Sequence, residues 1–337
     1  MGPNYRIDEV ALKVCRDWRW VRAHLADIAL FLSVAIAVVW PTMAGAQGIR
    51  WQFSTKDTVG NERDFLEDDD LDPTTPLVLQ GEDRFETDNW VRYIRPLGNG
   101  RVLRLGQQIK YRRFFDRSEL SGLYLTPRVE YWDQFDPEWE ARLLADYTYF
   151  NRDGDAWYNR VRAQAMLRYE PEDRLTMTMG RVLVSYYDYL TDSLPGFDQT
   201  RVLVGGEHYW YPGGADNYFR DTSFGLEAYY EHAFADGSNA SYDRVWLGAT
   251  AWWVEALPRL NIGVDGQIEF RDYGAAPGFA SASDRKETRY ELDLNLEYLL
   301  WEQAYWIGTI GYEFGRSKVD QYDYNGLVYE TGFKATF

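Results

Sequence analysis

The sequence predicts an all-β fold, a transmembrane antiparallel up-and-down β-barrel of about 14 strands. Three observations predict it. Apolar and polar residues alternate with a period of two through most of residues 47–337, aromatic residues make up 17% of the chain, and the connections between alternating segments are short and long in turn. A period of two is the repeat of a β-strand, and a closed sheet leaves no unpaired edge in lipid.

The first 46 residues have the pattern of a secretory signal peptide. Basic residues, an apolar run and a small-residue triplet follow one another: Arg16, Arg19 and Arg22, then 28–40, then Ala44-Gly45-Ala46. The apolar run is too short to span about 30 Å of hydrocarbon, and Ala44 and Ala46 suit signal peptidase. The triplet also disfavours the alternative, an uncleaved anchor helix. We therefore expect cleavage after Ala46, which leaves residues 47–337 as the barrel.

The predicted mature chain is acidic and has no thiol. The single cysteine is Cys15, which lies in the segment expected to be removed. Removal takes five basic and four acidic residues from totals of 36 and 53, leaving 31 and 49 and a net charge of −18. This composition excludes disulfide scaffolds and cysteine nucleophiles, and it makes nucleic acid an unsuitable partner. We expect no cofactor.

Fourteen segments have strand periodicity. They lie at about 48–58, 84–95, 101–114, 122–133, 139–150, 157–169, 174–189, 199–211, 221–234, 242–256, 258–273, 287–300, 304–317 and 326–337. Short connections such as 97–100 and 257–258 alternate with longer ones such as 191–199 and 274–286. Short periplasmic turns and longer extracellular loops produce this alternation, and an even number of strands brings both barrel ends to the periplasmic side. Residues 212–218 are long for a periplasmic turn.

Each predicted strand has two different faces, which residues 290–298 show most clearly. Apolar positions alternate with polar ones: Tyr290, Leu292, Leu294, Leu296 and Tyr298 with Glu291, Asp293, Asn295 and Glu297. Elsewhere aromatic residues gather at strand ends, as in the girdles at the two surfaces of a bilayer. A soluble β-protein, the alternative, would show the alternation without the girdles.

The last nine residues, 329–337, resemble the C-terminal strand of bacterial outer-membrane proteins. In those proteins the barrel-assembly machinery reads a final Phe and alternating apolar residues, and Tyr329, Phe333 and Phe337 fit this assembly signal, whereas Ala335 departs from the commoner aromatic residue. Together with 317–324, this end is similar both to β-barrel porins and to the fourteen-stranded barrel of the surface lipoprotein assembly modifiers. The resemblance implies the outer membrane of a Gram-negative bacterium, with the assembly machinery, outer-membrane lipid and lipopolysaccharide as partners.

Two charged walls are predicted in the lumen when the Leu, Val and aromatic face of each strand is taken as lipid-facing. The basic wall, expected to hold few acids, comprises Arg92, Arg104, Lys110, Arg112, Arg128, Arg142, Arg160, Arg162 and Arg168. The acidic wall, expected to hold few bases, comprises Glu227, Glu231, Asp265, Glu269, Glu291, Asp293, Glu297, Glu313 and Glu330. In a wet pore these walls would act on charged solutes, whereas in a collapsed lumen they would neutralise each other. We expect the wet pore, because fourteen strands enclose more space than side chains fill.

These features predict a porin-like channel for passive diffusion of small polar or charged solutes. A barrel for export or surface display of a lipoprotein is the first alternative, and a structural or adhesive barrel is the second. We expect no enzymatic activity, because the predicted mature chain holds only two histidines, His208 and His232, and no serine is marked by its spacing from them.

Two loops carry oxygen ligands of the kind that calcium prefers. Asn151, Asp153 and Asp155 alternate around a glycine, and residues 67–72 form a dense acidic run. The alternative for both loops is solvated surface charge, so no metal site is assigned.

Overall fold

The computed structural model describes residues 50–62, 82–115, 118–190, 198–213, 222–235, 241–273, 285–318 and 323–337. The signal peptide predicted for residues 1–46, with Ala44 and Ala46, lies outside the described residues, and so does the acidic run 67–72. Within the described part of the chain, no helix is long and apolar enough to cross a membrane.

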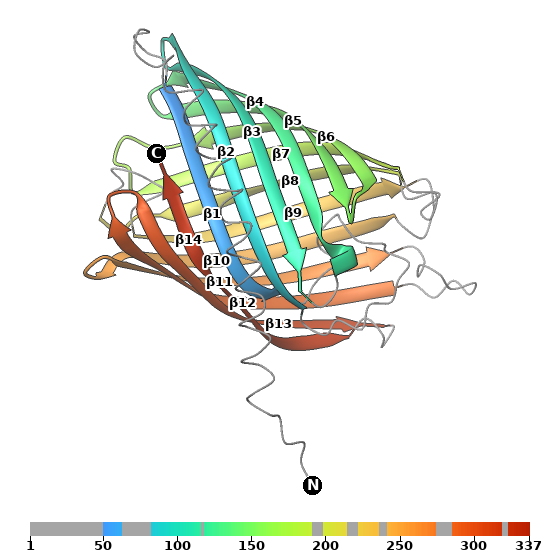
Figure 1. The fold of residues 1–337 in the computed structure, drawn as a ribbon. Coiled ribbons are helices and arrows are strands. Elements are labelled where there is room, and N and C mark those ends of the chain that lie inside the picture. Colours follow the sequence, from blue (N-terminus) through green and yellow to red (C-terminus); the bar gives the residue numbers. More distant parts are fainter. Residues whose placement is uncertain are drawn as a thin grey trace. The chain divides into compact units, whose positions relative to one another are not determined.

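Fourteen antiparallel strands make up the described structure (Figure 1). They are β1 (Arg50–Glu62), β2 (Glu82–Gly98), β3 (Arg101–Phe114), β4 (Gly122–Asp136), β5 (Trp139–Arg152), β6 (Asp155–Tyr169), β7 (Thr176–Tyr189), β8 (Gln199–Trp210), β9 (Ser223–Ala235), β10 (Tyr242–Leu257), β11 (Leu260–Tyr273), β12 (Arg285–Trp301), β13 (Ala304–Ser317) and β14 (Tyr324–Thr336). A short 3₁₀ helix, Ser118–Leu120, precedes β4. The predicted strand number is confirmed, and the strands predicted at 101–114 and 304–317 coincide with β3 and β13.

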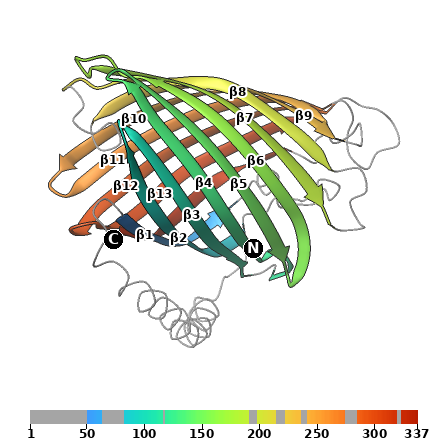
Figure 2. The ribbon, with the colours of Figure 1, turned by 90° about the horizontal axis from the view of Figure 1, so that it is seen from above.

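The sheet closes into a barrel through the pairing of β1 with β14, which lie side by side in Figure 1. Figure 2 shows from above how consecutive strands run side by side around the barrel. The seam between β1 and β14 runs from Ser54 opposite Thr336 to Asn61 opposite Tyr329. At its end the backbones of Phe53 and Phe337 exchange two hydrogen bonds, of 3.0 and 2.8 Å. Closure therefore satisfies the edge groups of both terminal strands, as a lipid-exposed sheet requires.

The connections show the predicted alternation, with two exceptions. The short turns after β2, β4, β10 and β12 lie at the rim where β1 begins and β14 ends, as the pairing of Ala304 with Ala335 shows. At this rim the connection from β8 to β9, residues 211–222, is long, as the sequence indicates. The second exception is the two-residue turn between β5 and β6, at the opposite rim. Asp153 and Gly154 both have positive φ angles, 49° and 93°, which is the conformation of a type I′ hairpin turn.

The outward face of the barrel is apolar in the middle and aromatic towards both rims. Leu105, Leu143, Val182, Leu247, Leu294 and Ile310 lie on this face and are exposed, although they are apolar. Trp210 and Trp253 extend the face near the short-turn rim, and Tyr230 and Tyr312 near the other. An apolar band between two aromatic girdles is what a bilayer selects, so the chain is a transmembrane barrel of the outer-membrane class.

Tyr329, Phe333 and Phe337, the predicted assembly signal, lie together on the outward side of β14 and its end, and all three are exposed. Their reading by the assembly machinery stays a prediction.

Two neighbouring residues of β12 test the assignment of the two faces. Leu294 is exposed on the outward face, whereas Asn295 donates a hydrogen bond to Asp265 (2.6 Å) and accepts one from Thr309 (2.7 Å) on the inner face. We expect Leu294→Arg to lower the free energy of unfolding by about 2 to 4 kcal/mol, because it places a charge in lipid near the midplane. Asn295→Arg should cost much less, since Asp265 and Asp293 are nearby. Refolding titrations in lipid vesicles measure both, and equal costs would contradict the assignment.

Candidate functional site

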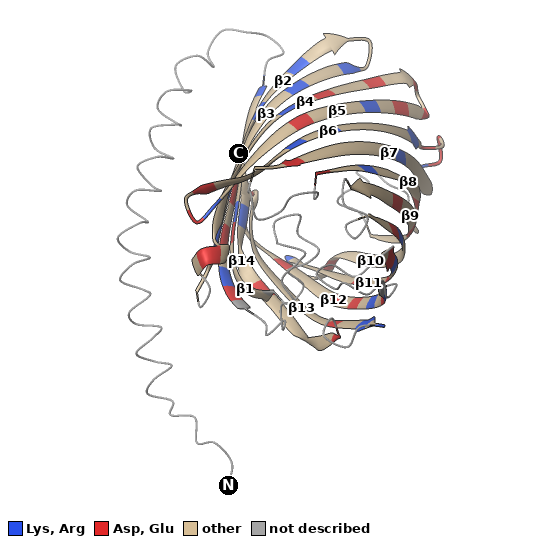
Figure 3. Ribbon diagram, turned by 90° about the vertical axis from the view of Figure 1, so that its right-hand side faces the viewer, with Lys and Arg blue, Asp and Glu red and all other residues tan. Residues whose placement is uncertain are grey.

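The charged side chains predicted to face inward all lie on the inner face of the barrel. Because side chains alternate along each strand, these charged residues lie on the face opposite to the exposed apolar residues. Several of them contact a residue that is two strands away, which is possible on the concave face of a barrel. Examples are Lys334 of β14 with Glu297 of β12, and Arg84 of β2 with Glu330 of β14. Figure 3 shows the charged positions along the strands around the barrel.

Stacked arginines and tryptophans form the centre of the basic wall. The ring of Trp132 has Arg104 and Arg142 over it, with their guanidinium carbons 3.5 and 3.8 Å from its centroid. Arg92 and Arg128 contact Trp90 in the same way, at 4.5 and 4.4 Å. A cation–π contact holds a guanidinium in place without cancelling its charge, so these stacks preserve positive potential on the inner face.

Carboxylates are interleaved with these arginines, which corrects the expectation of few acids on this wall. Asp146 contacts Arg128 (3.3 Å) and Arg162, and Glu140 contacts Arg142 and Arg168. Glu130 lies within 3.9 Å of Arg104. These acids occupy inward positions of β4 and β5, so the alternation that selected the arginines could have selected them as well. Arg160 donates to the hydroxyl of Thr148 (3.0 Å).

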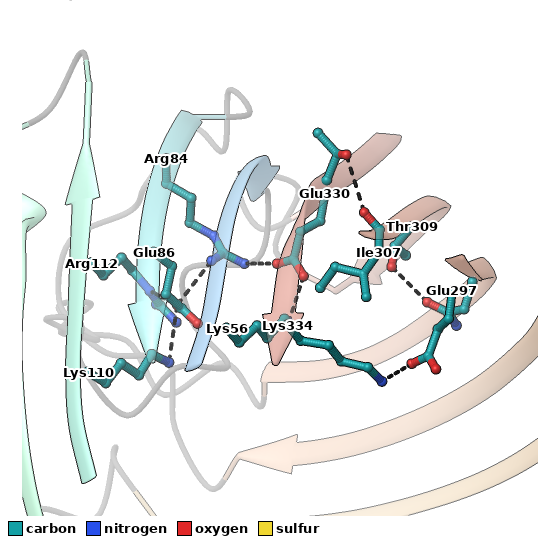
Figure 4. A network of polar contacts seen from close by, with 12 residues as sticks. Lys56, Arg84, Glu86, Lys110, Arg112, Glu297, Ile307, Thr309, Glu330 and Lys334 are labelled. Carbon is teal, nitrogen blue, oxygen red and sulfur yellow. Dashed lines mark hydrogen bonds and ion pairs between the residues drawn. The ribbon is translucent and has the colours of Figure 1, made fainter. Parts of the chain in front are cut away.

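The two walls meet at the seam of the barrel in a continuous network of ion pairs (Figure 4). Glu86 of β2 is surrounded by cations, with Arg84 and Arg112 at 3.0 Å and Lys110 at 3.3 Å. Arg84 also reaches Glu330 of β14 at 3.4 Å, and Lys56 of β1 contacts the same carboxylate at 2.7 Å. The two walls are therefore connected at this seam through Arg84, which contacts both Glu86 beside the basic wall and Glu330 of the acidic wall.

Part of the acidic wall is also paired, because it holds arginines that the sequence did not single out. Glu269 lies between Arg244 and Arg271 and is only 1% exposed. Arg289 contacts Glu287 at 2.9 Å, and Glu231 accepts a hydrogen bond from Tyr242 (2.8 Å). These groups form a buried structural network on β9 to β12.

Three other carboxylates of the acidic wall have a different environment. Among the described residues, Glu227, Asp265 and Asp293 make no ion pair. Asp265 accepts a hydrogen bond from the amide of Asn295. Glu291 and Glu313 lie opposite each other in the register of β12 and β13, beside this group. Net negative charge therefore persists at mid-height on β9, β11 and β12.

Solvent exposure divides the predicted lumen residues into two sets. The side chain of Arg112 is 7% exposed and that of Glu269 is 1% exposed, so both are sealed within ion pairs. By contrast, the side chains of Arg104, Lys110 and Arg162 are 27%, 23% and 21% exposed to solvent. The second set can act on a solute, whereas the first stabilises the fold.

Neither of the two described histidines lies on the inner face. His208 is hydrogen-bonded to Thr178 at 2.8 Å, and His232 to Asp243 at 2.8 Å, both on the outward side of their strands. A Ser-His-acid arrangement in the lumen therefore has no histidine within the described chain.

The candidate calcium ligands Asn151, Asp153 and Asp155 fall on the tight turn between β5 and β6. The side-chain oxygen of Asn151 accepts a hydrogen bond from the backbone N–H of Gly154 (3.2 Å), so this oxygen stabilises the turn. No group of three or more His, Cys, Asp or Glu side chains in the described residues could hold a metal ion.

Comparisons with known proteins bear on the fold. No family model matches the chain, and no curated protein sequence matches it. A loop-deletion mutant of OmpT, an outer-membrane protein of Vibrio cholerae, is similar in structure with a TM-score of 0.50 and 9% identity, over 86% of this chain and 99% of that one. This similarity supports the outer-membrane barrel fold.

Two further solved structures are similar at slightly lower TM-scores. The outer-membrane channel DcaP of Acinetobacter baumannii has a TM-score of 0.48 and 12% identity, over 87% of this chain and 99% of that one. An anion-selective porin from Comamonas acidovorans has a TM-score of 0.47 and 10% identity, over 86% of this chain and all of that one.

Proposed function

We propose that the protein is a passive channel of the outer membrane for small polar or charged solutes. The observation that carries the proposal is the solvent exposure of charged side chains at mid-strand on the inner face, such as Arg128 of β4 and Arg162 of β6. A charged group away from both water and a partner is prohibitively costly, so exposed charges at this depth favour a wet lumen.

The division of the charges also supports this proposal. A sealed lumen needs each inner carboxylate to be matched by a cation, because an unpaired buried charge costs several kcal/mol. Glu269 meets that condition, but Glu227, Asp265 and Asp293 do not within the described residues. The excess of arginine on β3 to β6 and of carboxylate on β9 to β12 would act on a permeating ion from opposite sides.

Conductance in planar lipid bilayers tests the proposal. We expect the purified protein to insert in discrete current steps whose size grows with salt concentration. A preparation that is folded, as shown by heat-modifiable migration on gels, and yet produces no current would contradict the channel. It would favour a sealed structural barrel instead.

A further inference from the structure

A hollow in the inner wall lies on β8 to β11, on the acidic side of the barrel. It has a volume of about 300 Å³, at the lower end of the range of about 300 to 1,000 Å³ for ligand sites. Its polar and aromatic lining residues are Tyr209, Ser223, Glu227, Thr250, Trp252, Asp265 and Gln267. In a closed ring of fourteen strands, β10 and β11 lie diametrically opposite the arginine stacks of β3 and β4.

Two glycines at inward positions create this hollow. Gly225 of β9 lies opposite Thr250 of β10, and Gly248 of β10 lies opposite Glu227 of β9. A Cβ atom on Gly225 would come within 2.5 Å of the Tyr209 ring, and one on Gly248 within 2.5 Å of the Glu227 carboxylate. The Tyr209 ring and the Glu227 carboxylate therefore lie directly against the backbone of these two glycines, and this leaves space on their lumen side. Glycine inside a strand commonly marks such a close approach.

The charge of the hollow is negative, and no ion pair within the described chain neutralises it. Glu227 and Asp265 line it, no lysine or arginine does, and neither carboxylate makes an ion pair within the described chain. Arg181 is near Glu227, but its guanidinium is hydrogen-bonded to Glu207 at 3.0 Å. Both carboxylates are therefore available to a bound cation, because neither forms an ion pair with a lysine or arginine of the described chain.

Aromatic rings complete the lining. Tyr209 extends over Gly225, and its hydroxyl donates to Glu207 (3.1 Å), which fixes the ring. Trp252 lies over the backbone of Gly263, where a Cβ would be 2.3 Å from its ring. Aromatic faces beside carboxylates suit a cation that carries apolar groups, because the ring quadrupole attracts the charge while the ring contacts the methyl or methylene groups.

We propose that this hollow binds small organic ammonium ions. This proposal rests on the proposed channel function and names a class of solute that would bind to the acidic wall during passage. Inorganic cations gain less from the two rings, because they have no methyl or methylene groups to pack against them. Anions are excluded by Glu227 and Asp265.

Equilibrium binding to the protein purified from membranes in detergent micelles tests the site without requiring conduction. The probe is choline, and its control is 3,3-dimethylbutan-1-ol, which has the same shape with carbon in place of the charged nitrogen. We expect choline to bind saturably and more weakly as salt rises, and the neutral alcohol not to bind. Glu227→Gln should weaken choline binding by about fivefold, as expected for removing one contact between full charges in a wet site.

A matched control removes one negative charge from the other wall. Asp88 of β2 accepts hydrogen bonds from Gln108 at 2.9 and 3.0 Å, and Asp88→Asn retains an oxygen for that contact. This variant should bind choline as the unaltered protein does. Equal binding of choline and the neutral alcohol, or equal binding by Glu227→Gln and the unaltered protein, would overturn the site. Binding without conductance would leave the site intact and refute the channel, so the two proposals can fail separately.

Discussion

Glu269→Gln should destabilise the barrel by about 3 to 5 kcal/mol, the usual cost of removing one partner from a buried ion pair. Glu269 is 1% exposed, with the guanidinium of Arg244 on one side and that of Arg271, 2.8 Å away, on the other. Arg271 is itself buried, with a side chain 4% exposed, and it also donates to the hydroxyl of Tyr273 (2.9 Å). Glutamine can accept from one of the two arginines but presents its own donors to the other. The negative charge between the two guanidinium groups is then lost, although Arg271 stays buried.

The measurement is the midpoint of urea unfolding in lipid vesicles, followed by tryptophan fluorescence. A matched control lies three residues further along the same strand, where Asp272 pairs with Lys286 at 2.5 Å and both side chains are 50% exposed. Asp272→Asn should cost about 1 kcal/mol at most, because an exposed pair is screened by water. Similar small losses in both variants would show that water reaches Glu269 and that the network on β9 to β12 is not sealed.

Most of the fold could be predicted from the sequence, because a β-barrel imposes the same two-residue repeat on each strand. Leu294 and Asn295 could be assigned to opposite faces from that repeat alone. The turns are less predictable: the oxygen ligands around Asp153 and Gly154 suggest a cation loop, whereas the positive φ angles of these two residues form a tight hairpin. The repeat indicates where a strand lies, but the type of turn depends on backbone conformation at two residues.

The site could be predicted in part, for a related physical reason. Alternation is a property of one strand, so it placed Arg104 and Glu269 on the inner face. Pairing depends on register between strands, and Arg84 and Glu330 are 246 residues apart in sequence. No pattern within either strand indicates that they meet at the seam. The same limit applies to the hollow beside Gly225 and Gly248, since a glycine opens space only when its neighbours across the sheet are known.

Arg104 and Arg142 place two positive charges over the ring of Trp132 on the inner face of the barrel. Replacing both with glutamine should increase the preference of the channel for cations. A unit charge about 7 Å from an ion's path contributes about 0.6 kcal/mol in water, so losing two changes the ion's energy by about 1 kcal/mol, or about fivefold in relative permeability. The fold should tolerate the change, because each nearby carboxylate still has an ion-pair partner: Glu130 has Arg128 at 3.7 Å, and Glu140 has Arg168 at 3.0 Å.

Reversal potentials in a salt gradient measure this preference, and the shift should shrink as the Debye length falls from about 10 Å at 0.1 M salt to about 3 Å at 1 M. Arg95→Gln with Arg101→Gln is the matched control, since it removes two arginines from exposed positions outside the inner face. This pair should leave the reversal potential unchanged. The opposite replacement, Glu227→Gln with Asp265→Asn, should move the preference towards anions, because it removes charge of the other sign from the other wall. If neither lumen variant shifts the potential while both remain folded, ions do not pass between these walls, and the exposed charges of the inner face serve the stability of the barrel instead.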